Sequence, residues 1–249
     1  MAMTSVKAFN NQKGSRLRVE SSAKSPSDPT GQCTSGKKSS ASLVSLCIAA
    51  LVLFTCITRA GATTGEDVNL RTMQISRGFR IIGAATGDNT GNSVSSAGDV
   101  NGNGVGDIIV GAFAGNSGAG VTYVIFGQRS RTSDVFLSAM VTGRYTGFRI
   151  LGAGTTDRSG RSVSTAGDVN GDGIGDIIIG ADLAASYAGT AYVIFGRNVT
   201  SSNVFTDINL GSFGSGIGFR IIGAVPGDQC GNSVSAVGDV NGDNIADVI

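Results

Sequence analysis

A nine-residue acidic string occurs three times in this chain, and it constrains the fold more than any other feature. Its copies are Asp99-Val-Asn-Gly-Asn-Gly-Val-Gly-Asp107, Asp168-Val-Asn-Gly-Asp-Gly-Ile-Gly-Asp176 and Asp239-Val-Asn-Gly-Asp-Asn-Ile-Ala-Asp247. Successive copies begin 69 and 71 residues apart. Self-similarity at a nearly fixed spacing is typical of repeat architectures. We therefore expect this part of the chain to consist of three related units.

Each unit contains short β-rich segments separated by turns rich in Gly, Asp, Asn and Ser. In the middle unit these segments are 147–153, 160–164, 177–181 and 191–196. Four such segments without sustained helical periodicity predict a four-stranded antiparallel meander. A meander repeated radially is the blade of a β-propeller, while stacked sandwiches and a β-solenoid are the alternatives left open.

The predicted fold class is therefore all-β, with β-propeller blades in an incomplete ring, preceded by a disordered tail and one hydrophobic helix. The ring is expected to be incomplete because the third unit ends inside a strand, whereas propellers use four to eight blades. The predicted domains are a disordered basic tail at 1–38, a hydrophobic segment at 39–59, blades at 67–133 and 134–206, and a truncated blade at 207–249.

The hydrophobic segment contains twenty uncharged residues, from Ser39 to Thr58, which is the length that a helix needs to span a bilayer. Lys37 and Lys38 precede it, so the positive-inside rule places the N-terminus in the cytosol. A retained signal-anchor and a signal peptide cleaved near Ala60 both remain open, with a buried soluble helix as a weaker alternative. Either membrane interpretation predicts repeats that are membrane-anchored outside the cell or secreted. The sequon Asn198-Val-Thr200 would then be a glycosylation site.

Composition argues against several classes of function. The chain contains no histidine, so it lacks the commonest general base and the commonest transition-metal ligand. Residues 59–249 carry twelve Lys and Arg against sixteen Asp and Glu, so no basic surface predicts a nucleic-acid partner. Only Cys230 of the four cysteines lies in the repeats, which excludes a disulfide within them.

The acidic strings have the donor pattern of a cation-binding loop. Side-chain oxygens occupy positions one, three, five and nine, and a backbone carbonyl is expected to contribute at position seven. An all-oxygen cage suits Ca²⁺ better than Mg²⁺, which demands stricter octahedral geometry, so the predicted cofactor is one Ca²⁺ per loop. The predicted metal ligands are Asp99, Asn101, Asn103, Val105, Asp107, Asp168, Asn170, Asp172, Ile174, Asp176, Asp239, Asn241, Asp243, Ile245 and Asp247.

These loops differ from an EF-hand, which needs a bidentate Glu at its twelfth position where this chain has Val110 or Ile179. We therefore expect each loop to lie within a β-hairpin. The first loop has two carboxylates and the other two have three each, which predicts that the first binds Ca²⁺ most weakly. The alternative is that Asp and Asn simply form turns by bonding to their own backbone. Three copies in register favour the metal site.

The units resemble the FG-GAP repeat, the blade of the seven-bladed propeller in integrin α chains and in many bacterial and protist surface proteins. The resemblance covers about 67–249 and rests on Ser-Val-Ser-x-x-Gly-Asp-Val-Asn-Gly, the Asp at position nine and the Gly-Ala after the apolar run. It implies that the loop residues named above bind calcium. The Phe of "FG" is replaced by Thr90, Ser159 and Cys230, and the Pro of "GAP" is replaced by Phe113 and Asp182.

The sequence therefore predicts an extracellular, non-catalytic calcium-binding module for cell adhesion or surface recognition, with a protein or glycan ligand. The alternatives are an accessory domain of a surface hydrolase, of phospholipase or glycosidase type, and a lectin-like carbohydrate-binding module. Arginines recur in Gly-Phe-Arg, and an outward-facing strand residue or an ion pair between blades is favoured over a ring of anion-binding guanidiniums. The residues concerned are Arg80, Arg149 and Arg220. The recurring phenylalanines are expected in the blade cores, at Phe79, Phe126, Phe148, Phe195 and Phe219.

Overall fold

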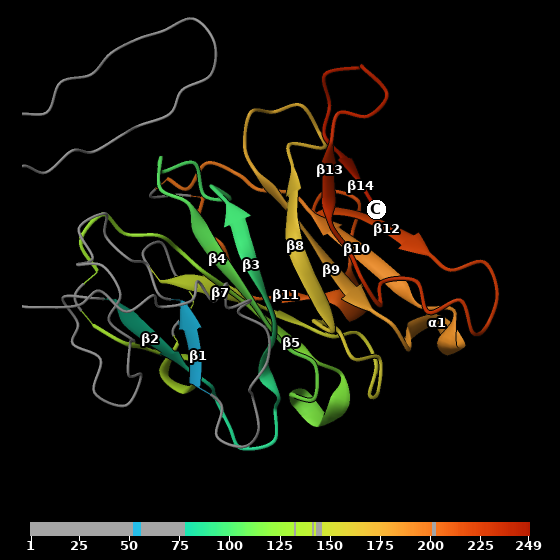
Figure 1. Ribbon diagram of the computed structural model, residues 1–249, viewed down its shortest axis with the longest axis horizontal. Helices are drawn as coiled ribbons and strands as arrows, with labels where there is room; N and C mark the ends of the chain where they lie inside the picture. Colours follow the sequence, from blue (N-terminus) through green and yellow to red (C-terminus); the bar gives the residue numbers. More distant parts are fainter. Residues whose placement is uncertain (1–51, 56–77, 132, 141, 143–145, 201–202) are drawn as a thin grey trace, which may run out of the picture. The chain divides into compact units, whose positions relative to one another are not determined.

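The computed structural model describes residues 52–55, 78–131, 133–140, 142, 146–200 and 203–249 (Figure 1). The chain divides into two units, and every described residue belongs to the second, Cys47–Ile249. The predicted tail at 1–38 lies outside the described residues, as does most of the hydrophobic segment at 39–59.

The described part is mostly β-strand in several sheets with little helix, which confirms the all-β class. One sheet has the order β11-β7-β5-β4-β3, and its strands are β3 (Thr90–Gly98), β4 (Asp107–Ala112), β5 (Val121–Ile125), β7 (Gly147–Leu151) and β11 (Ile208–Asn209). A second has the order β12-β10-β9-β8, with β8 (Ser162–Gly167), β9 (Asp176–Ala181), β10 (Thr190–Ile194) and β12 (Gly218–Ile222). All neighbours in these two sheets are antiparallel except β7 and β11.

Two smaller sheets complete the described strands. One pairs β1 (Val52–Thr55), β2 (Phe79–Ile82) and β6 (Val135–Phe136), and the other pairs β13 (Ala236–Gly238) with β14 (Asp247–Val248). The helical turns are η2 (Asn116–Gly118), η3 (Leu137–Ala139), α1 (Ala184–Tyr187) and η4 (Leu210–Ser212). The sheets of the described residues do not close into a ring.

In each large sheet, the last strand of one sequence unit pairs with the Gly-Phe-Arg strand of the following unit. β7 carries the Gly-Phe-Arg segment of the unit at 134–206, yet it pairs with β5 of the unit before it. Gly147 permits this pairing, because its φ is +130° and an added Cβ would lie 1.9 Å from the carbonyl oxygen of Val124. Gly218 meets Val193 in the same way where β12 pairs with β10. The sheets are therefore offset by one strand from the sequence units.

The apolar runs after the first two acidic strings are largely buried on both faces. On β4, Ile109 packs into the core shared with the second sheet, while Val110 packs into the core shared with β2. Successive side chains of a strand point to opposite faces, so a strand covered on both sides needs apolar residues at every position. On β9, Ile177 and Ile178 likewise belong to two different cores.

Val52–Thr55 is the only part of the hydrophobic segment 39–59 that the structure describes, and it forms β1 on the edge of β2. The expected helix is therefore wrong for these four residues. Val, Phe and Thr favour strands, and pairing satisfies the backbone groups along the free edge of β2. None of the helices in the described residues is long and apolar enough to cross a membrane.

Candidate metal-binding loops

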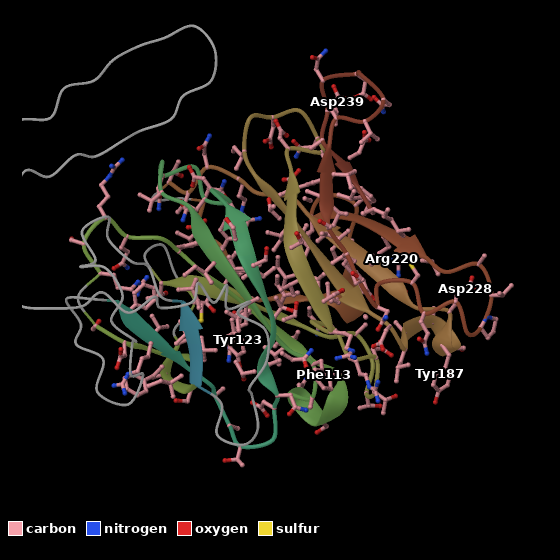
Figure 2. The ribbon with its side chains drawn as sticks, viewed as in Figure 1. Phe113, Tyr123, Tyr187, Arg220, Asp228 and Asp239 are labelled. Atoms are coloured by element: carbon pink, nitrogen blue, oxygen red, sulfur yellow. The ribbon has the colours of Figure 1, made fainter. Side chains whose placement is uncertain are left out.

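The three acidic strings form equivalent hairpin loops, named here the first loop (99–107), the second loop (168–176) and the third loop (239–247). They connect β3 to β4, β8 to β9, and β13 to β14. In each hairpin the residue before the string pairs with its ninth residue, as in Gly98 with Asp107. Figure 2 shows Asp239 in the loop that joins β13 and β14. The expected placement within β-hairpins is confirmed.

The second loop is folded around the carboxylate of Asp168. Its Oδ1 accepts the N–H groups of Gly171 at 2.8 Å and Asp172 at 3.1 Å, and its Oδ2 accepts that of Gly173 at 2.7 Å. At the third position, Asn170 Oδ1 accepts the N–H of Asp172, and at the fifth position, Asp172 Oδ1 accepts the N–H of Ile174. Gly171 and Gly173 have positive φ of +74° and +83°, which turns the backbone amides inward.

The other two loops have nearly the same hydrogen bonds. In the first loop Asp99 accepts the N–H groups of Asn103 at 3.0 Å and Gly104 at 2.7 Å. In the third loop Asp239 accepts those of Gly242 at 2.6 Å and Asn244 at 2.9 Å, with Asn244 in the left-handed region at φ +67°. In each loop the backbone N–H of the seventh residue donates to the side chain of the fifth residue. The seventh residues, whose carbonyls are predicted ligands, are Val105, Ile174 and Ile245.

The ninth-position carboxylates connect the first two loops to a neighbouring segment. In the third loop, Asp247 accepts the N–H of Val240, which lies within the loop, at 2.8 Å. Asp176 is fully buried, and it accepts the N–H of Val169 at 2.9 Å and that of Gly196 at 2.8 Å. Asp107 does the same with Val100 at 3.0 Å and Gly127 at 2.7 Å. The sequence argument missed Gly127 and Gly196, although both stand in the recurring Ile-Phe-Gly. These bonds fix the base of the loop to the end of the next strand.

Burial of these carboxylates is electrostatically unfavourable without a cation. Burial raises the pKa of Asp107 to about 7, with the nearby Asp99 carboxylate acting in the same direction and the N–H groups of Gly127 and Val100 opposing it. Burial also raises the pKa of Asp176, and Asp172 and Asp168 add to the effect. No Arg or Lys of the described residues forms an ion pair with a loop carboxylate. A bound cation would supply the missing positive charge.

The donor set fits a hard cation, because it consists of carboxylate, amide and carbonyl oxygens. A carboxylate oxygen that accepts one N–H keeps a second lone pair for a metal. Within the described ranges, however, no three His, Cys, Asp or Glu side chains already form a group that could hold a metal ion.

Successive loops touch one another, an arrangement that the sequence did not predict. The N–H of Gly175 in the second loop donates to the carbonyl of Asp99 in the first loop at 3.4 Å. At the equivalent positions, Ala246 of the third loop donates to Asp168 of the second at 3.1 Å. Asn198 of the predicted sequon is exposed, and its side chain lies against Gly102 of the first loop. The three loops therefore form one row.

The recurring arginines join consecutive sequence units. Arg80 pairs with Asp134, and Arg149 pairs with Asp207, each through its side chain and its backbone N–H. Of the two favoured interpretations, an outward-facing strand residue or an ion pair, the structure shows the ion pair for these two arginines. Arg220 is exposed and forms no ion pair with any described residue. Four of the five phenylalanines are buried or half-buried, whereas Phe219 is 40% exposed.

The pair of Arg80 and Asp134 predicts a pH effect. The hydrogen bond from the Arg80 side chain lowers the pKa of Asp134. A carboxyl with a lowered folded pKa stabilises the fold above its unfolded pKa, and that stabilisation is lost as the pH falls through the folded pKa. We expect the melting temperature of the wild type to fall more steeply below about pH 4 than that of Asp134→Asn. The difference will be small because the Arg80 side chain is 40% exposed and water screens the pair. Parallel curves would contradict this role.

Comparison with known proteins agrees with the fold and the loops. The FG-GAP repeat model matches residues 159–194, which comprise β8, the second loop, β9 and β10, so the chain contains an FG-GAP repeat. Integrin alpha pat-2 of Caenorhabditis briggsae is 32% identical over 102 residues, and integrin alpha pat-2 of Caenorhabditis elegans is 34% identical over 102 residues. Each match covers 41% of this chain and 8% of the relative. The chain is thus distantly similar to integrin alpha and spans only that small share of its length.

Proposed function

We propose that the chain is an extracellular, calcium-binding β-propeller module for cell adhesion or surface recognition, without catalytic activity. The FG-GAP repeat and the similarity to integrin alpha support this class. The stacking of the sheets supports propeller blades. β3 and β8 are edge strands of the two large sheets. The N–H of Val163 on β8 donates to Ser93 Oγ on β3 at 2.9 Å, so these two edges approach each other. Strands nearest a propeller axis are expected to approach in this way.

One observation carries the calcium proposal: three loops place side-chain oxygens at the same four positions in nearly the same hydrogen-bonded form. The ninth position is in each case a carboxylate that has no cationic partner among the described residues. Ca²⁺ would neutralise the carboxylates and pin each hairpin at its base. Because the loops are in contact, the bound ions would stiffen one continuous edge of the module. Its ligand would be an extracellular protein or glycan. Attachment to a membrane through residues 39–59 would require Val52–Thr55 to leave the edge of β2.

The fifth position of the first two loops offers a reciprocal test. Asn103 and Asp172 both accept the N–H two residues further on, so exchanging amide and carboxylate preserves the turn while it moves one charge. We expect Asp172→Asn to weaken Ca²⁺ binding at the second loop about tenfold, and Asn103→Asp to strengthen the first loop by a similar factor, since affinity follows the carboxylate count.

Calorimetric titration of the full chain with Ca²⁺ would measure both effects. The double variant, with both substitutions, serves as the control, because it restores the total charge and exchanges the order of the two sites. Affinities that do not respond to either substitution would mean that the loops are ordinary Asx turns. Calcium binding would then have to be abandoned as the role of these loops.

A further inference from the structure

Two arginines on one turn of the second unit lie beside a buried aspartate, and the three residues are named here the arginine cluster (Arg158, Arg161 and Asp182). The Asp182 side chain is 5% exposed. Its Oδ2 lies 3.7 Å from Arg158 Nη1 and 4.0 Å from Arg161 Nε, and both distances are too long for hydrogen bonds. Asp182 Oδ1 and Arg161 Nε are buried without a hydrogen-bond partner among the described residues. The cluster therefore contains polar groups that the folded chain leaves unpaired.

Backbone contacts hold the arginine turn in place. The N–H of Arg158 donates to the carbonyl of Gly118 at 3.1 Å, and the N–H of Arg161 donates to the carbonyl of Gly180 at 3.2 Å. The guanidinium carbon of Arg161 lies 5.3 Å from the centre of the Phe113 ring, within the range of a cation–π contact. The two arginine side chains are nevertheless 45% and 36% exposed. A ligand in solution can therefore reach guanidiniums that are already held close together.

The repeated unit does not require arginine at these two positions. The equivalent turns of the first and third units carry uncharged side chains, namely Asn89 and Asn92, and Gln229 and Asn232. Arg158 has a left-handed backbone with φ of +59°, as do Asn89 at +53° and Gln229 at +52°. Asparagine adopts this conformation more readily than arginine does, so the local backbone does not favour Arg158. The two arginines therefore indicate a role other than folding.

The charge of the cluster favours an anion. Two guanidiniums and one carboxylate give it a net charge of +1, whereas residues 59–249 together carry more acidic than basic side chains. β9 begins at Asp176 in the second loop and ends just before Asp182, so the cluster and the acidic loops lie at opposite ends of the strands. Figure 2 likewise shows Phe113 and Asp239 at opposite ends of the view. The planar fork of a guanidinium matches a carboxylate, which it can bind through two parallel hydrogen bonds.

We propose that the arginine cluster binds a carboxylate group of an acidic polysaccharide. The turn of Arg158 adjoins the turn that contains Gly118, where an added Cβ would lie 3.5 Å from the backbone N of Thr156. The exposed residues of these two turns include small polar side chains, namely Asn116, Ser117, Thr155 and Thr156. Hydroxyl and amide groups both donate and accept hydrogen bonds, as sugar hydroxyls do. Peptides are more often bound by a strand edge or an apolar groove.

The polysaccharide is the ligand of the proposed recognition function, so its biological role rests on that function. Asp182 would not touch the sugar. Its buried charge would hold the two guanidiniums side by side, and these would donate to the carboxylate of the ligand. Binding at the cluster does not require Ca²⁺ in the acidic loops.

Fluorescence anisotropy of a labelled galacturonic acid oligosaccharide, titrated with the full chain in a non-ionic detergent and a chelator, tests the proposal. The chelator prevents Ca²⁺ from bridging the sugar to the loop carboxylates. We expect the wild type to bind, and the double variant Arg158→Asn, Arg161→Asn to bind at least about tenfold more weakly. Asparagine is the residue that the first unit carries at both positions, so the turn should be kept.

Two further double variants serve as controls. Arg129→Asn with Arg220→Asn removes the same charge from exposed arginines that form no ion pair with the described residues, and it should bind like the wild type. Arg158→Lys with Arg161→Lys keeps the positive charge beside Asp182 but loses the guanidinium forks. Its affinity should lie between those of the wild type and the asparagine variant.

A wild type that does not bind the oligosaccharide overturns the proposal, and so does equal binding by the wild type and the asparagine variant. Equal binding of a neutral galactose oligosaccharide of the same length would rule out recognition of the carboxylate. Tighter binding of poly-glutamate would show that the ligand is an acidic protein segment and not a glycan. Because the chelator is present throughout, none of these results affects calcium binding by the loops, which thermal unfolding tests separately.

Discussion

Replacing Phe148 with alanine is expected to cost about 3–5 kcal/mol of unfolding free energy, the largest effect of any substitution considered for this chain. Phe148 is 1% exposed on β7. Its ring stacks on Phe205 at a centroid distance of 4.2 Å and lies 6.0 Å from that of Phe126. Truncation removes these contacts and leaves a cavity in the core between the two large sheets, where close packing limits relaxation.

Phe219 provides the matched control, because it occupies the same position of the next Gly-Phe-Arg strand and is 40% exposed. Phe219→Ala should cost less than half as much as Phe148→Ala, since much of its ring already contacts water. Denaturant unfolding of both variants, compared with the wild type, measures the difference. Equal losses of stability would show that the position within the repeat, rather than burial by the neighbouring sheet, determines the cost.

This contrast also marks what the sequence could predict. Periodic β-rich segments and turn residues were sufficient for the all-β class and the hairpin position of the acidic loops. They could not distinguish Phe148 from Phe219, because both stand in the same Gly-Phe-Arg context. Burial depends on whether another sheet covers the strand, which is a tertiary property.

The partner of each Gly-Phe-Arg strand was also beyond sequence reasoning. A tandem repeat has no unique starting point, so the segment could pair with its own unit or with the preceding one. Gly147 resolves the choice, because only a residue without Cβ fits against the carbonyl of Val124. The hydrogen bonds that Asp107 accepts from Gly127 and that Asp176 accepts from Gly196 were likewise not predicted. They join residues twenty positions apart, and local motif analysis treats such residues separately.

The strand at Val52–Thr55 illustrates a different limit. Twenty uncharged residues predict a helix by their length, yet four of them pair with the edge of β2. Hydrophobicity alone cannot distinguish these outcomes, because Val, Leu and Phe serve both a spanning helix and a strand. Pairing with a partner strand decided the local structure there.

Removal of Ca²⁺ is expected to produce the second large effect, a fall in the melting temperature of the full chain. A ligand that binds only the folded state at a hundred times its dissociation constant stabilises it by roughly 3 kcal/mol per site. For a domain of this size, one such site corresponds to roughly 5–10 °C. The contacts between Gly175 and Asp99, and between Ala246 and Asp168, would transmit the loss from one loop to the next.

Thermal unfolding of the full chain in millimolar Ca²⁺, in millimolar Mg²⁺ and with a chelator is the most direct test of calcium binding by the loops. The matched variant carries Asp168→Asn, Asp172→Asn and Asp239→Asn, which keep side-chain oxygens for the turns while removing three carboxylates. We predict that Ca²⁺ raises the melting temperature of the wild type well above its value in chelator, that Mg²⁺ does so less, and that the variant responds weakly. Identical melting of the wild type in all three conditions would contradict the calcium proposal.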